Sequence, residues 1–129
     1  MAHNGRVEIY DLGVPGEMRD RLVAAVVSGV KSATSSLKLF YGDGDPLPEP
    51  GRFLLADSSG VRGIVEVVRV ELVPLGQVGD DVAHAEGEGF ADAAAWRAAH
   101  EDFWAPYLNE PLTDDDLVVV EHFTFAPSG

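Results

Sequence analysis

The alternation of apolar and polar residues predicts five strands. Residues 52–57 and 61–75 flank a Ser-Ser-Gly turn and have the pattern of a hairpin with a long second strand. Residues 33–41 contain threonine and aromatic side chains, which suit a pleated strand. Residues 117–126 alternate in a similar way, and residues 6–12 are expected to form a short edge strand.

Apolar residues that recur every three or four positions predict two helices. Residues 15–29 begin with Pro-Gly, and Gly29 suits the position just after a helix. Residues 91–108 are expected to form the second helix. The buried stripe expected on that helix consists of Trp96, Ala99, Phe103 and Tyr107. Residues 76–90 begin like a further helix and then reach two glycines.

These elements predict an α+β fold. Short turns join the middle strands, so most strands can pair antiparallel. We expect a small β barrel with helices packed on its outside, in one domain over residues 1–129. A Rossmann fold is not expected, because no strand is followed by G-x-G-x-x-G. The apolar face expected on the long strand consists of Ile64, Val68, Val70 and Leu72, with Glu66 among them.

The charge pattern narrows the classes of partner. The chain has 22 acidic and 9 basic residues and a net charge of −13. Between residues 76 and 129 the only lysine or arginine is Arg97. Binding along a nucleic-acid backbone needs several cations on one face, so a long RNA partner is disfavoured. A small ligand in a locally basic pocket remains compatible with this charge.

Composition adds expectations about location and cofactors. No apolar run approaches ~18–20 residues, so no membrane span is expected. The N-terminal stretch lacks a basic segment followed by apolar residues, so we expect a cytoplasmic protein without a secretory leader. The chain has no cysteine, which excludes disulfides and a cysteine nucleophile. Its four histidines lack zinc-motif spacing, so neither a metal nor a cofactor is expected.

The stretch GVKSATSSL, residues 29–37, contains the first candidate for chemistry. Lys31 lies just before a predicted strand, where its long side chain can reach the hydroxyl of Thr34. A hydroxyl nucleophile needs a nearby base, and a desolvated lysine can serve as one. The same spacing is also consistent with a lysine at a helix end beside a polar strand.

Two further short segments carry candidate residues. In AEGEG, residues 85–89, glycine can turn the chain so that Glu86 or Glu88 points away from its helix, although an acidic surface loop has the same pattern. In WRAAH, Trp96 and His100 are four residues apart with Arg97 beside them. That group could stack on or pair with a base or phosphate, or it could be a core tryptophan with polar neighbours.

Together, in this order, these segments resemble the ASCH domain family, named for activating signal cointegrator 1 homology. The resemblance covers roughly residues 12 to 126 and is closest to the longer bacterial members. It implies a PUA-like β barrel with flanking helices and a cleft. Members of the family have been linked to RNA binding, to ribonuclease activity and to an amidohydrolase that removes the acetyl group from N4-acetylcytidine.

The resemblance also implies roles for individual residues. The amidohydrolase subgroup uses a lysine, a threonine three residues later and a downstream glutamate, which correspond here to Lys31, Thr34 and Glu88. Those members are shorter and lack the AEGEG and WRAAH pair, so a different nucleoside, a nucleotide or an unrelated amide remains open as substrate. The residues expected to bind the substrate are Ser36, Tyr41, Glu86, Trp96, Arg97 and His100. The alternative is an RNA- or nucleotide-binding module, or a ribonuclease, without this acyl chemistry.

Overall fold

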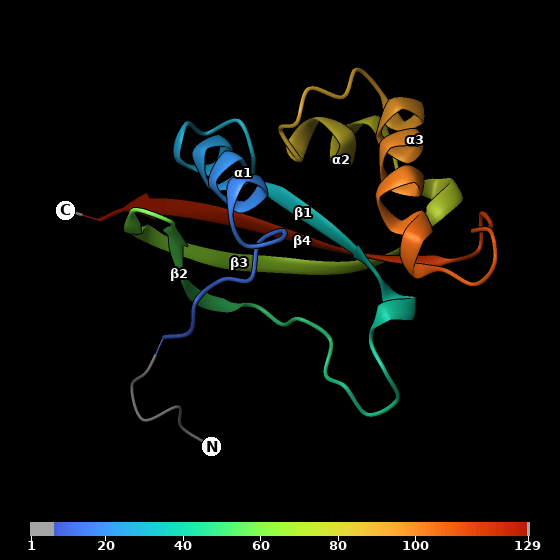
Figure 1. The fold of residues 1–129 in the computed structure, drawn as a ribbon, viewed down its shortest axis with the longest axis horizontal. Coiled ribbons are helices and arrows are strands. Elements are labelled where there is room, and N and C mark those ends of the chain that lie inside the picture. The colour runs from blue at the N-terminus through green and yellow to red at the C-terminus, as the bar shows by residue number, and fades with distance from the viewer. Residues whose placement is uncertain (1–6, 129) are drawn as a thin grey trace.

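A computed structural model describes residues 7–128 as one antiparallel sheet with helices packed around it (Figure 1). The elements in chain order are α1 (Glu17–Val27), β1 (Ala33–Leu37), β2 (Gly51–Asp57), β3 (Gly60–Pro74), α2 (Asp80–Ala85), α3 (Ala93–Trp104) and β4 (Leu117–Pro127). Single 3-10 turns follow β1, β3 and α3. Among the described residues, no helix is long and apolar enough to cross a membrane.

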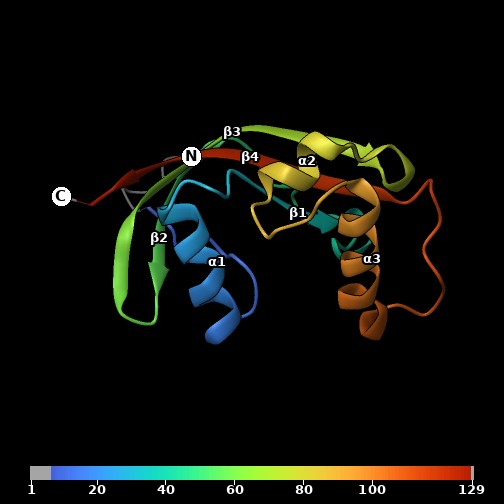
Figure 2. The ribbon, with the colours of Figure 1, turned by 90° about the horizontal axis from the view of Figure 1, so that it is seen from above.

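The four strands are arranged in the order β1-β4-β3-β2, and every neighbouring pair is antiparallel. The long strands β3 and β4 form an arched half-barrel, and Figure 2 shows α1 and α3 at its two ends. The expected α+β class and antiparallel pairing are therefore confirmed. Because β1 and β2 are the outer strands, alternate backbone groups of β1 face away from the sheet.

Two hydrophobic clusters hold the helices to the sheet. One joins α2 and α3 to β1 and contains Trp96, Trp104 and Val118. The other places α1 against β2 and β3 and contains Val23 and Leu55. Strand β4 contributes to both clusters, with Val118 and Val120 in the first and Phe123 in the second.

The buried face of β3 differs from the one expected. Val65 and Val67 are buried, whereas Glu66, Val68 and Leu72 are exposed. The pairing of β3 with β4 shifts between Val67 and Arg69, so an extra residue interrupts the alternation. The prediction that Glu66 lies on an apolar face was therefore wrong, because apolar residues occupy both faces of this strand and a bulge changes their register.

The apolar stripe predicted for α3 was also wrong. Trp96 and Trp104 are buried, but Phe103 and Tyr107 are 43% and 66% exposed. The inward-facing positions are Trp96, His100 and Trp104, which are spaced by four residues. Aromatic residues occur on more than one side of this helix, so periodicity alone did not identify the buried side.

Two predicted strands are shorter in the structure than in the sequence pattern. Residues 7–12 contribute only an isolated bridge between Ile9 and Leu54, and residue 6 lies outside the described residues. The strand expected over residues 33–41 ends at Leu37 and continues as a 3-10 turn. Both departures lie next to loops, where local pattern is a weak guide to strand ends.

Candidate functional site

Lys31 lies in the loop that joins α1 to β1, and its side chain is almost completely buried. Only 2% of the residue is exposed. Its Nζ donates a hydrogen bond of 3.1 Å to the backbone oxygen of Glu86. The same nitrogen is 3.5 Å from Oε2 of Glu88. The fold therefore brings together the lysine and the glutamate that the sequence resemblance singled out.

The glycine between the two glutamates allows this contact. Gly87 has a φ of +67°, a backbone conformation that side chains with a Cβ rarely adopt. A Cβ at this position would lie 2.3 Å from the backbone oxygen of Val30 and 2.7 Å from the Cα of Lys31. The loop after α2 can approach the loop before β1 this closely only because residue 87 has no side chain.

Glu86 is a buried carboxylate with three polar neighbours. Its exposure is 1%. One oxygen, Oε2, accepts hydrogen bonds of 2.6 Å from Ser35 Oγ and from Trp96 Nε1. Burial alone would raise the pKa of Glu86, but the hydrogen bond and charge of His100, with the charge of Lys31, hold that pKa below its ordinary value. The group is therefore a fixed negative charge inside the protein.

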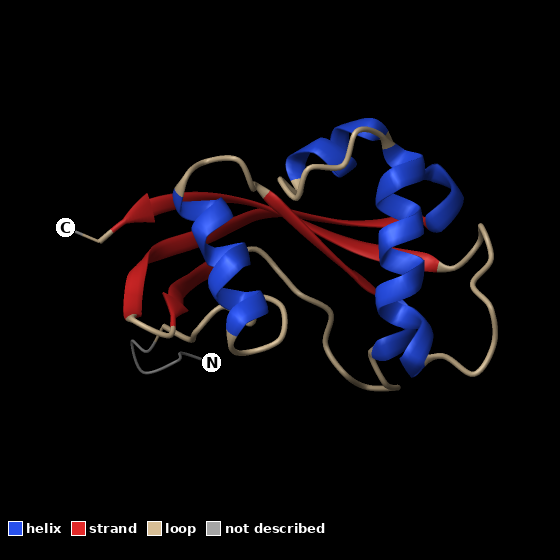
Figure 3. Cartoon of the chain, turned by 45° about the horizontal axis from the view of Figure 1, so that its top comes forward, coloured by secondary structure: helices blue, strands red, loops and turns tan. Residues whose placement is uncertain are grey.

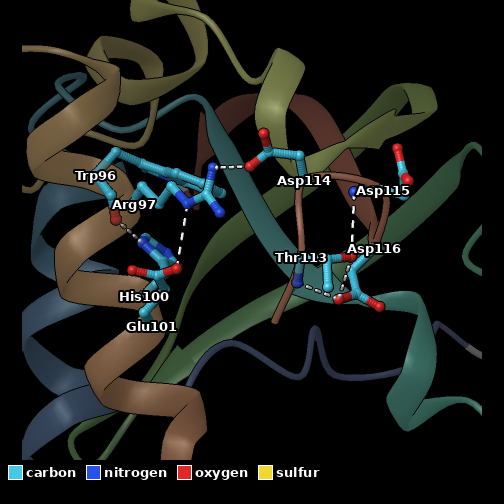
Figure 4. A network of polar contacts seen from close by, with 8 residues as sticks. All are labelled: Trp96, Arg97, His100, Glu101, Thr113, Asp114, Asp115 and Asp116. Carbon is cyan, nitrogen blue, oxygen red and sulfur yellow. Dashed lines mark hydrogen bonds and ion pairs between the residues drawn. The ribbon is translucent and has the colours of Figure 1, made fainter. Parts of the chain in front are cut away.

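His100 completes this buried group. Its ring stacks on Trp96 with the centroids 4.3 Å apart, and its Nδ1 is 2.8 Å from the backbone oxygen of Trp96 (Figure 4). That contact makes Nδ1 the donor and turns Nε2 toward Oε1 of Glu86, at 3.4 Å. Burial alone would lower the pKa of His100, but the hydrogen bond and charge of Glu86 raise it above its ordinary value.

Two side chains of this group, those of Glu86 and His100, line a cleft with a volume of about 190 Å³. Thr34 and Ser35 both line it, although neighbouring residues of a strand point to opposite faces. The cleft therefore lies along the outer edge of β1, and Figure 3 shows this strand passing between α1 and α3. Glu86, Glu88 and His100 line the same cleft.

A larger hollow of about 450 Å³ lies beside Leu108. Its lining includes the acidic residues Glu101, Asp102 and Glu110, and none of the residues predicted from the sequence as site residues lines it. The smaller cleft is therefore the better candidate site, because it combines concave shape with convergent polar groups.

Other predicted site residues lie outside the cleft. Figure 4 shows Arg97 pointing to Asp114, and its guanidinium is 2.6 Å from Oδ1 of that residue and 3.2 Å from Glu101. Ser36 and Tyr41 share a hydrogen bond of 3.0 Å and do not line the cleft. Trp96 is fully buried, so it supports His100 and Glu86 from behind.

Sequence reasoning missed several residues of the cleft. Ser35 was not among the predicted site residues, although its hydroxyl contacts both Glu86 and His100, at 2.6 and 3.4 Å. Arg21 of α1 and Phe103 of α3 also line the cleft. The alternation of side chains along the strand was the one sequence signal that could have indicated Ser35. Nothing in the local sequence indicates that residues of α1 and α3 line the same cleft.

The relation between Lys31 and Thr34 is looser than the spacing suggested. Within residues 7–128, no hydrogen bond joins the two side chains. Both are connected to the cleft instead, Thr34 directly and Lys31 through Glu88. Their catalytic roles remain predictions.

A sequence model of the ASCH domain matches residues 8–126, which is most of the chain. The chain belongs to the ASCH domain family. This confirms the resemblance seen in the order of the GVKSATSSL, AEGEG and WRAAH segments. A search among curated proteins finds no significant match to this sequence.

Two solved structures are similar to this ASCH domain. An ASCH domain from Lactobacillus crispatus JV V101 has 27% sequence identity and a TM-score of 0.80, with 95% of this chain and 81% of that chain covered. Protein EF3133 from Enterococcus faecalis V583 has 29% identity and a TM-score of 0.73, with 94% and 76% covered. The similarity supports the arched sheet and flanking helices as the shared fold of these proteins.

Proposed function

We propose that this ASCH domain binds a small, nucleoside-like amide in the cleft between α1 and α3 and hydrolyses it. The observation that carries the proposal is the convergence of a hydroxyl, Thr34, and a carboxylate, Glu88, on one concave site. The carboxylate is held in place by the buried ammonium of Lys31. A nucleophile, a proton acceptor and a positioning group are the minimum set for acyl transfer.

The contacts favour roles for Lys31 and Glu88 that differ from those suggested by the sequence, in which Lys31 acts as the base. Lys31 already donates to the backbone of Glu86 and pairs with Glu88, so its protons face acceptors. Glu88 lines the cleft, and its side chain is 26% exposed. We therefore assign proton acceptance to Glu88 and the positioning of its carboxylate to Lys31.

The proposed reaction has two steps. Thr34 Oγ1 attacks the carbonyl carbon of the amide, and its proton passes to Glu88. Collapse of the tetrahedral intermediate breaks the C–N bond, and Glu88 returns the proton to the leaving nitrogen. Water then attacks the threonyl ester, which releases the carboxylic acid and restores the hydroxyl. The sum is amide plus water giving acid plus amine.

The test is to incubate the purified protein with N4-acetylcytidine and follow cytidine and acetate by chromatography. Thr34→Val removes the hydroxyl at nearly constant volume, and turnover should fall at least ~100-fold. Thr124→Val makes the same change at an exposed position of β4, outside the cleft, and should leave turnover unchanged. Undiminished turnover by Thr34→Val would contradict the assignment of the nucleophile.

A further inference from the structure

Arg21 is a cation that lines the cleft, and its surroundings differ from those of most other arginines. It is exposed on α1 and lines the same cleft as Thr34 and Glu88. In the part of the chain that the structure describes, no carboxylate lies within ion-pair distance of its guanidinium. Four other arginines do have such partners; these are Arg19, Arg62, Arg69 and Arg97.

Among the described residues, Arg52 of β2 also lacks a carboxylate partner, but it lies outside the cleft, so Arg21 is the unpaired arginine that lines it. With 22 acidic residues against 9 basic ones, most cations of the surface can find a carboxylate. A guanidinium without one keeps its planar fork of donors free for a bound anion. Such a fork fits phosphate oxygens well, because two parallel N–H···O bonds can form.

The size of the cleft indicates which part of a ligand it can enclose. Its volume of about 190 Å³ is below the ~300–1,000 Å³ of pockets that bury drug-sized molecules. At ~30 Å³ for each water molecule, it corresponds to about six waters. The cleft can therefore enclose a single ring with its substituents, while the rest of a larger ligand lies at the mouth.

The distribution of polar groups in the cleft indicates the orientation of a bound molecule. Glu86 and His100 are largely buried at the inner end, and Phe103 and Trp104 provide apolar walls. The buried carboxylate of Glu86 disfavours an anion at that end. Arg21 is exposed, so its charge is available at the open side of the cleft.

We infer that Arg21 binds the phosphate of a nucleoside monophosphate whose base occupies the cleft. This inference rests on the proposed function of the cleft as a nucleoside-like site, and it specifies the ligand as a nucleotide. The base faces the inner polar group, and the phosphate extends to the mouth. The protein then discriminates between a nucleotide and its nucleoside through one side chain.

The experiment compares binding of cytidine 5′-monophosphate and cytidine at 150 mM salt by tryptophan fluorescence. The chain has two tryptophans, and one of them, Trp104, lines the cleft. We expect the monophosphate to bind at least 10-fold more tightly than cytidine. Arg21→Ala should erase this ratio, and Arg21→Lys should retain part of it. Arg97→Ala, whose guanidinium pairs with Asp114 away from the cleft, should keep the full ratio.

The outcomes separate this inference from the proposed function. Equal binding of both compounds, unchanged by Arg21→Ala, overturns the phosphate site and leaves the cleft as a nucleoside site. Tighter binding of the monophosphate that survives Arg21→Ala overturns the role of Arg21. Failure of the wild-type protein to bind either compound overturns both, because the inner end of the cleft then recognises no such base.

Discussion

The ammonium nitrogen of Lys31 lies 3.1 Å from the backbone oxygen of Glu86, a residue 55 positions further along the chain. Ser32 strengthens this junction, since its backbone nitrogen donates to the backbone oxygen of Ala85 at 2.7 Å. Two loops that are distant in sequence are therefore joined beside the cleft. The position of Glu88 depends on this junction, because it follows Glu86 by two residues and pairs with the same ammonium group.

The first prediction concerns the glycine at the junction. Gly87→Ala places a Cβ 2.3 Å from the backbone oxygen of Val30, at a φ of +67°. The free energy of unfolding should fall by more than about 2 kcal/mol, because unfavourable backbone conformation adds to a clash with main-chain atoms. Urea denaturation followed by tryptophan fluorescence measures this change.

Gly89→Ala is the matched control for that variant. Gly89 also has a positive φ, +88°, but nothing lies within 4 Å of a Cβ added there. Its substitution should cost about 1–2 kcal/mol, from the backbone conformation alone. Equal losses for the two variants would contradict the idea that close packing of the loops, in addition to backbone conformation, requires Gly87.

The second prediction separates the two glutamates. Glu86→Ala leaves the indole N–H of Trp96 without its acceptor in a fully buried position. Removing one member of a buried, paired group costs about 3–5 kcal/mol, and we expect a loss of stability in that range. Glu88→Gln should cost less than about 1 kcal/mol, because that side chain is partly exposed, while turnover is lost. Thermal denaturation and a turnover assay on both variants measure these effects. A large loss of stability in Glu88→Gln, or a small one in Glu86→Ala, would contradict the prediction.

The third prediction concerns Lys31. Lys31→Met keeps most of the apolar stem and removes the ammonium, so Glu88 loses its partner but can still contact water. The free energy of unfolding should fall by about 1–2 kcal/mol. Turnover should fall at least ~100-fold, because Glu88 is no longer held in place. Lys38→Met makes the same change at an exposed residue and serves as the control. Wild-type turnover by the Lys31 variant would show that the ammonium has no part in the reaction.

Of the strand pairings in this ASCH domain, the β2–β3 hairpin was predictable from local signals, whereas the pairings of β4 with β1 and β3 join segments distant in sequence and were not predicted. The turn after Asp57 and the alternation on both sides of it identify the β2–β3 hairpin. The buried side of β3 was not predictable in the same way. Val65, Val67, Val68 and Val70 occupy both faces, and only the bulge near Val68 in the folded sheet determines which of them pack inward.

The site was predictable only in part, for a related reason. The lysine and the glutamate loop were identified through their order in the chain, but the roles of neighbouring residues depend on helix rotation. Arg97 adjoins the buried Trp96 in sequence, yet a rotation of about 100° per residue turns it toward Asp114. Arg21 lines the cleft because α1 packs against the same sheet as α3, and the sequence of α1 does not reveal that arrangement.

The fourth prediction concerns the pH dependence of stability. The pKa of His100 is raised above 6.5 in the folded protein by Glu86, so its contribution is complete below pH 6.5 and is lost as the pH rises through the raised value. Burial would raise the pKa of Glu86, but His100 outweighs that effect and lowers the pKa below 4.5. The contribution of Glu86 to stability is therefore complete above pH 4.5 and is lost as the pH falls further. The pair therefore stabilises the fold most between pH 4.5 and 6.5. Urea denaturation should show that stability falls more steeply between pH 6.5 and 9 in the wild-type protein than in Glu86→Gln, whose amide keeps an acceptor for Trp96 but carries no charge. Parallel pH profiles for the two proteins would mean that Glu86 does not hold the proton on His100.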